Sequence, residues 1–231
     1  MLPAAAFCYD GVMNRGDLIR FLERSVNRPD MADGYPDWIN QAMRSIYRDH
    51  SFLCMRHEVT VTMESGATSV LLPDDFKELR SERSPIYMVG SDGSMLPCDV
   101  SRESTERRLL TANQTIIVPE NPSTIFRNLP VWIEWGATNA ELYTVYPVSG
   151  STNFRIKYYR FLPDLTADDD KNQITMQYEE MVKAKLSAVA FEELRDPEWQ
   201  DQEGLYVERR RAAIADDAYR AQKGRRTQMG S

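Results

Sequence analysis

The sequence predicts an α+β fold: a helical bundle formed by N- and C-terminal helix pairs, with an inserted β-rich domain that resembles a sandwich or small barrel. Two observations predict it. Apolar residues recur at helical spacing before His50 and again after Asn172. Between them, short aromatic and β-branched runs alternate with turn residues, which is typical of strands. We expect the bundle to comprise residues 14–50 and 172–222, the inserted domain residues 51–165, and a C-terminal tail residues 223–231.

Two helices are expected near the N-terminus. Residues 17–27 place their apolar side chains at helical spacing, and Asn14 or Asp17 can cap the first turn. This helix must end before Pro29, because a residue that precedes proline disfavours helical geometry. A second helix is expected over residues 36–50, whose apolar positions form one continuous stripe: Trp38, Ile39, Ala42, Met43, Ile46 and Tyr47.

The middle of the chain has the period of β-strands. Residues 58–63 and 68–72 flank a Ser-Gly turn, and residues 85–89 and 95–98 flank a second turn signal at 90–93. We expect each pair to form a hairpin. A short helix over 101–111 and further strands over 131–135, 141–148 and 154–161 follow, for about six to eight strands in total.

Helical periodicity returns after Asn172 and ends at Asp196-Pro197, and a charged final helix follows over residues 198–222. We expect helix propensity to end near Lys223-Gly224, since glycine costs about 1 kcal/mol in a helix interior. The remaining residues have almost nothing to bury and alone are expected to be disordered. The stripes flanking the β insert are expected to pack together as the bundle core, with Trp38, Ile39, Met43 and Ile46 against Met181, Val182, Leu186 and Val189.

Composition excludes several classes of protein. The chain has 231 residues, of which 42% are hydrophobic and 27% charged, so it can bury a core. No run approaches the ~20 apolar residues of a membrane span. The net charge of −7 is unlike that of a generic nucleic-acid binder, which is usually basic. Three widely spaced cysteines, without a CxxC pair, are expected to be reduced thiols in a cytosolic product, and no secretory signal is expected.

Catalytic and metal-binding patterns are scarce, so we expect no enzyme activity, no cofactor and no metal. Cys54 and His57 are too few for a zinc site and lack the surroundings of a nucleophile. Four residues match positions 1, 3, 5 and 12 of a calcium loop, but Gln173 replaces the glycine that the sharp turn requires. We interpret them instead as an acidic cluster before a helix: Asp168, Asp170, Asn172 and Glu179.

Paired aromatic residues leave one binding function open. Trp132 and Trp135 could form a stacking platform for a sugar or a single-stranded nucleic acid. Three residues apart on one strand, they face opposite sides, so we favour core filling.

Three segments together resemble the head-to-tail adaptor (connector) proteins of tailed bacteriophages. The first is Trp38-Ile-Asn-Gln-Ala42 followed by Ile46-Tyr-Arg48. The second is Val70-Leu-Leu-Pro-Asp-Asp-Phe-Lys-Glu-Leu79. The third is Arg155-Ile-Lys-Tyr-Tyr-Arg-Phe-Leu-Pro-Asp-Leu165, which leads into the helix 178–194 and an Asp196-Pro-Glu break. The segments span residues 17–211, and the insert 80–150 departs from the pattern.

The resemblance implies a structural virion protein without an active site. Members form a ring of twelve copies on the portal protein, hold the tail or nozzle protein below, and pass double-stranded DNA through the lumen without sequence specificity. The chain would then be a virion component at the head–tail interface, assembled in the host cytoplasm, with no membrane partner. Its C-terminal tail would reach along a portal subunit, and Arg220, Lys223, Arg225 and Arg226 would bind acidic or carbonyl groups there.

Three other functions stay open at this point. A carbohydrate- or receptor-binding β-module of a tail appendage would use Trp132 and Trp135 in an exposed cluster, although it would not need two helix pairs. A stopper or tail-completion protein would share the general features of an adaptor. An unrecognised hydrolase built on Cys54 and His57 is the weakest alternative.

Overall fold

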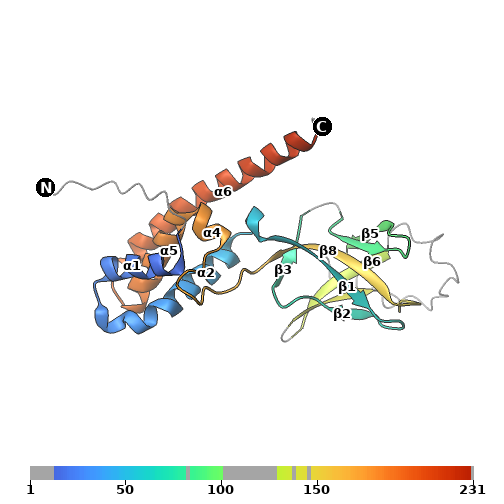
Figure 1. Ribbon diagram of the computed structural model, residues 1–231, viewed down its shortest axis with the longest axis horizontal. Helices are drawn as coiled ribbons and strands as arrows, with labels where there is room; N and C mark the ends of the chain where they lie inside the picture. The colour runs from blue at the N-terminus through green and yellow to red at the C-terminus, as the bar shows by residue number, and fades with distance from the viewer. Residues whose placement is uncertain (1–12, 82–83, 101–128, 137–138, 145–146, 230–231) are drawn as a thin grey trace. The chain divides into compact units, whose positions relative to one another are not determined.

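The computed structural model describes residues 13–81, 84–100, 129–136, 139–144 and 147–229, and it confirms the α+β class (Figure 1). The chain forms two compact units. One combines Met1–Cys54 with Leu162–Ser231, and the other is Met55–Phe161. The described helices of five or more residues belong to the first unit, and the described strands belong to the second. The chain therefore leaves the helical unit after Cys54 and returns to it at Leu162.

Both predicted caps act together at the start of helix α1 (Arg15–Val26). Asn14 Oδ1 accepts the N–H of Asp17 at 2.9 Å, and Asp17 Oδ2 accepts the N–H of Asn14 at 3.1 Å. The helix ends at Asn27, which adopts the left-handed conformation with a φ of 50°. A 3₁₀ turn, Pro29–Gly34, then leads into helix α2 (Tyr35–Asp49).

The helical stretch after Asn172 is divided into helices α4 (Gln173–Gln177) and α5 (Glu179–Glu193). Asn172 caps α4, because its Oδ1 accepts the N–H groups of Ile174 and Thr175. The helix is interrupted at Tyr178, whose φ of −130° and ψ of 43° are not helical. The Tyr178 ring packs against that of Phe52, with the ring centroids 5.0 Å apart.

Helix α5 is the central element of the helical unit and contacts α1, α2, α4 and α6. A helix with neighbours on several sides is buried around most of its circumference. Small residues outside the predicted stripe, Ala184 and Ala188, are therefore buried as well. The residues expected in the bundle core all have exposed fractions of 6% or less: Trp38, Ile39, Met43, Ile46, Met181, Val182, Leu186 and Val189.

Helix α6 (Trp199–Met229) differs from the expected helix and tail. It continues through Gly224, so residues 223–229 are helical where disorder was expected. One glycine costs about 1 kcal/mol, and the lysine, arginine and glutamine residues around it have high helix propensity. With 31 residues the helix is about 46 Å long, roughly twice the length of α5.

The described residues of the second unit form an eight-stranded sheet with the strand order β1-β8-β4-β5-β6-β7-β2, in which β3 also pairs with β8. Neighbouring strands are antiparallel except for β5 and β6. Seven of the strands contribute to one shared core that includes Met63, Phe76, Ile86, Leu142 and Phe154. The strands are β1 (Arg56–Met63), β2 (Ser69–Leu71), β3 (Phe76–Leu79), β4 (Ile86–Val89), β5 (Met95–Val100), β6 (Leu129–Trp135), β7 (Ala140–Thr144) and β8 (Thr152–Arg160).

One predicted hairpin is confirmed and the other is wrong. β4 and β5 pair directly, with Met88 opposite Leu96. In contrast, β1 pairs with β8 and β2 pairs with β7, although Gly66 still reverses the chain between them with a φ of +80°. The N–H of Gly66 bonds to the carbonyl of Val148, outside both strands. Alternation predicts that a strand exists, but its partner depends on the whole sheet. The helix expected over 101–111 lies outside the described residues.

Candidate functional site

The C-terminal end of α6 is the candidate site, because it carries the residues expected to bind the portal. We call residues 218–229 the α6 arm. The arm contains four basic residues and no acidic one. Arg220 and Lys223 are exposed, and Arg225 and Arg226 follow in the same helix. The arm corresponds to about 18 Å of helix.

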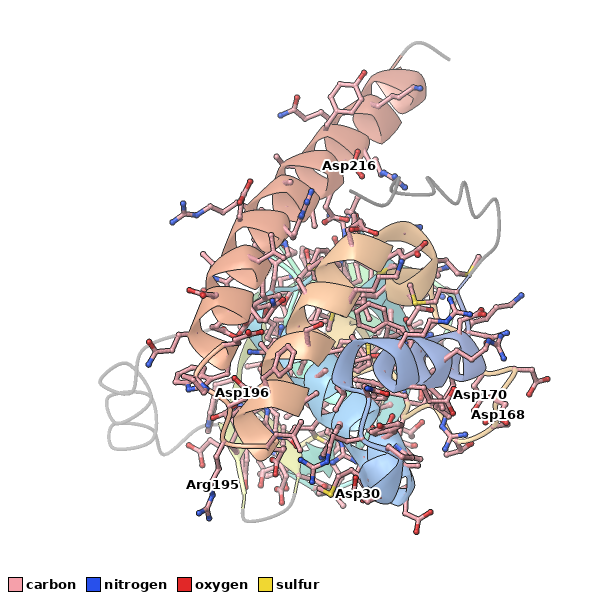
Figure 2. The ribbon with its side chains drawn as sticks, turned by 90° about the vertical axis from the view of Figure 1, so that its left-hand side faces the viewer. Asp30, Asp168, Asp170, Arg195, Asp196 and Asp216 are labelled. Atoms are coloured by element: carbon pink, nitrogen blue, oxygen red, sulfur yellow. The ribbon has the colours of Figure 1, made fainter. Side chains whose placement is uncertain are left out.

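The described side chains of the arm, at residues 218–223, are mostly exposed. The last buried residue among the described side chains of α6 is Asp217. Tyr219, two residues later, is 65% exposed. Figure 2 shows α6 continuing past Asp216 beyond the shorter helices of this unit. A basic segment at a helix C-terminus is also favoured by the helix dipole.

A pair of adjacent aspartates divides the buried part of α6 from the arm. Asp216 is partly exposed and forms an ion pair with Arg220, with 2.7 Å between Asp216 Oδ2 and Arg220 Nε. Asp217 is 6% exposed, and it is the only carboxylate among the described residues that is classed as buried. Its oxygens accept the N–H of Leu53 at 3.1 and 3.0 Å and the hydroxyl of Tyr178 at 3.1 Å. Burial, together with Asp217, raises the pKa of Tyr178 above its ordinary range.

A second polar contact holds α6 two to three turns earlier. The hydroxyl of Tyr206 and Nη1 of Arg210 each donate to Asp49 Oδ2 at 2.7 Å. Burial first, and Asp49 second, raise the pKa of Tyr206 above its ordinary range. Asp49 is the last residue of α2, so this contact joins the end of α2 to α6. Sequence periodicity did not identify either carboxylate contact, because aspartates in charged helices usually face solvent.

A polar groove of about 580 Å³ lies on the helical unit between α2 and α5. Its lining combines both signs of charge, including Asp37, Arg48 and Glu192. Arg44 forms an ion pair with Asp164 at its edge. A lining with mixed charge does not favour one class of charged ligand.

The two tryptophans that were considered as a stacking platform differ in their exposure to solvent. Trp132 is 6% exposed and stacks on Tyr143 at 5.7 Å, while Trp135 is 61% exposed. Core filling is therefore the better description for Trp132 and is wrong for Trp135. A stacking platform built from both tryptophans would need both side chains exposed, and Trp132 is buried.

Cys54 and His57 do not have the environment of a catalytic pair. Burial and the nearby Asp217 raise the pKa of Cys54 to about 11, which disfavours the thiolate that a nucleophile needs. His57 lies in β1 with its ring edge-on to that of Tyr158 at 5.5 Å. Cys98 is buried in the β core, and burial raises its pKa to about 12. In the described part of the chain, no group of three or more His, Cys, Asp or Glu residues is arranged to hold a metal ion.

The side chains of the calcium-loop pattern bind other protein groups. Asp168 forms an ion pair with Arg15, and Glu179 forms one with Lys183. Asp170 Oδ2 accepts the N–H groups of Thr166 and Ala167 at 2.7 Å, and these bonds lower its pKa. Asn172 caps α4. Figure 2 shows Asp168 and Asp170 together beside α1.

Removal of divalent cations is therefore expected to leave the melting temperature unchanged. The oxygen atoms that would coordinate calcium already accept hydrogen bonds or pair with Arg15 and Lys183. The measurement is thermal unfolding with and without EDTA, with a calcium-binding protein as the positive control. A decrease of several degrees on chelation would contradict this expectation and support a calcium loop.

Comparison with known proteins identifies a family for the chain. No curated protein matches the chain significantly. None of the described helices has the length and hydropathy needed to span a membrane. The family model of the SU10 adaptor protein matches residues 13–230, which include both units and the α6 arm. This match confirms the resemblance to phage adaptors, and the chain belongs to the SU10 adaptor protein family.

Proposed function

We propose that the chain is the subunit of a head-to-tail adaptor ring that docks on the portal through the α6 arm. Membership of the family makes it a phage adaptor and a structural component of the virion. The finer proposal is a ring of twelve copies, which holds the tail or nozzle protein below and passes double-stranded DNA through its lumen. The chain has no catalytic role in this proposal, and it assembles in the host cytoplasm. The helical unit serves as the bundle that supports the arm.

The α6 arm is the observation that carries the proposal. A 31-residue helix ends in a basic segment whose described side chains are mostly exposed. The part of α6 that precedes the arm is held by Asp49 and Asp217, so the arm starts from a fixed base. A basic helix suits an acidic groove or a row of carbonyl groups on another protein. The portal is the partner that an adaptor family implies.

The negative net charge of the chain is consistent with the proposed passage of DNA through the lumen. The chain has a net charge of −7 although the arm is basic, so acidic residues predominate elsewhere. A lumen rich in acidic residues repels phosphates and does not retain a moving duplex, whereas a basic lumen would bind it.

Truncation after Arg220 is expected to abolish docking on purified portal while leaving the fold intact. The cut removes Lys223, Arg225 and Arg226 but keeps Asp217 and the Asp216–Arg220 pair. Circular dichroism checks folding, and mass photometry with portal measures assembly. Full docking by the truncated chain would refute the proposal.

A matched pair of charge variants separates the effect of position from that of net charge. Arg225→Gln with Arg226→Gln changes the arm, and Arg209→Gln with Arg211→Gln changes exposed positions earlier on α6. Both variants remove two positive charges. We expect the arm variant to dock at least ten-fold more weakly, with a reduced dependence on salt, and the earlier variant to dock like the wild type. Equal losses in both would indicate a nonspecific charge effect.

A further inference from the structure

We propose that Asp217 is the positioning residue of the docking site. It fixes α6 where the arm begins, and it joins that point to Leu53–Met55, the connector that precedes β1. This inference rests on the proposed function, because positioning matters only if the arm binds a partner. Asp217 itself is not proposed to contact that partner.

The geometry of Asp217 links three segments of the helical unit. Its carboxylate lies on α6 and accepts hydrogen bonds from Leu53 in the connector and from Tyr178 between α4 and α5. Leu53 begins the 3₁₀ turn Leu53–Met55, and β1 starts at the next residue, Arg56. Tyr178 is itself held by its ring contact with Phe52. The donors therefore belong to packed segments, and they define one position for the carboxylate.

A carboxylate is an unusual choice for this buried position if packing is its only purpose. Burying a charge is costly, and an apolar side chain of similar volume commonly gives equal or greater stability. Hydrogen bonds add direction, since they weaken steeply when the angle at the hydrogen falls toward 120°. A tilt of the arm about its base would stretch or bend the bonds to Leu53 and Tyr178. Asp217 therefore restricts the direction in which the arm leaves the helical unit.

Asp217 also marks the position on α6 beyond which opening of the helix from its C-terminus breaks buried hydrogen bonds. None of the described side chains at residues 218–223 is buried, so fraying of the arm from its C-terminus exposes little that is described as buried. Opening past Asp217 breaks its three hydrogen bonds. The next buried side chain toward the N-terminus is Ala213, one turn earlier.

Native-state hydrogen exchange on the full chain tests the anchor without any partner. In Asp217→Asn, the side chain keeps its shape but loses its negative charge, and an amide NH₂ group replaces one of the two oxygens that accept the N–H of Leu53, so the hydrogen bond from Leu53 is weakened. We expect at least ten-fold faster exchange of the Leu53 amide. The boundary of protection on α6 should retreat from Asp217 toward Ala213. Asp216→Asn, at the adjacent, partly exposed position, is the control: it removes the ion pair with Arg220 but should leave exchange of the Leu53 amide as in the wild type. An unchanged Leu53 amide and an unmoved boundary in Asp217→Asn would overturn the proposal.

Docking on the portal then separates positioning from simple stabilisation. We expect Asp217→Asn to dock about ten-fold more weakly than the wild type at a temperature where both are fully folded. Tyr178→Phe, which removes only one donor to Asp217, should show a smaller loss. Unchanged docking by folded Asp217→Asn would show that the residue only stabilises the fold and would overturn the positioning role. If the wild type itself does not dock, the proposed function fails, while the exchange experiment still decides whether Asp217 anchors the arm.

Discussion

Phe154→Ala is expected to lower the free energy of unfolding of the β unit by about 3–5 kcal/mol, the range for removing a large aromatic side chain from a core. Phe154 is fully buried on β8, opposite Val61 of β1 and Met88 of β4. Alanine would therefore leave a cavity bordered by two neighbouring strands, which are too constrained by hydrogen bonds to collapse into it. Urea unfolding followed by tryptophan fluorescence measures the change. Trp38 and Trp199 lie in the helical unit, so they are replaced by phenylalanine in every chain that is compared, and the signal then comes from Trp132 and Trp135 in the β unit.

The control for this variant is Leu71→Ala in the same unit. Leu71 lies on β2 and is largely exposed, so its truncation should cost less than about 1 kcal/mol. Equal losses for Phe154→Ala and Leu71→Ala would contradict the described core. A loss of less than 1 kcal/mol for Phe154→Ala would have the same meaning.

Ile46→Ala should destabilise the helical unit by roughly 2–4 kcal/mol. Ile46 is fully buried on α2, which packs against the central helix α5. The effect can be measured by urea unfolding followed by circular dichroism at a helical wavelength. Leu205→Ala is the matched control on α6, because Leu205 is exposed and its side chain has nearly the same volume. A small effect at Ile46 together with a large one at Leu205 would reverse the assignment of buried and exposed faces.

The two variants also test whether the units unfold independently. The chain has two compact units, and multi-domain proteins often do not unfold in one two-state step. If the units are independent, Phe154→Ala shifts the fluorescence transition of the β unit and Ile46→Ala shifts the helical transition. Coincident shifts in both variants would show that the units unfold as one cooperative body.

Local patterns in the sequence predicted most of the individual elements. The capping box of α1 depends on Asn14 and Asp17, three residues apart, so it can be recognised without the rest of the fold. The β4–β5 hairpin depends on a short turn with Gly93, which adopts a φ of +80°. The alternation of Val59 and Val61 predicted the strand β1. In each case, residues close in the sequence provide the interactions that specify the element.

Sequence did not predict features that depend on distant partners. The partner of β1 is β8, about 95 residues later, and no local pattern distinguishes that pairing from a hairpin with β2. Trp132 and Trp135 are the same type of residue on the same strand, but Trp132 is buried and Trp135 is exposed. The extension of α6 beyond Gly224 also exceeded the prediction, because the cost of a single glycine was weighted more than the propensity of its neighbours.

The sequence by itself determined the α+β class, the existence of the main helices and strands, the basic end of the chain and the resemblance to phage adaptors. These depend on periodicity, turn residues and charge, which are properties of short segments. Only the tertiary structure showed that α5 is the centre of the helical unit and that Asp217, unlike Asp216 beside it, is buried. Adjacent helical positions point about 100° apart, so which aspartate meets Leu53 and Tyr178 depends on how α6 is rotated against α5. That rotation results from the packing of the whole unit, which no short segment contains.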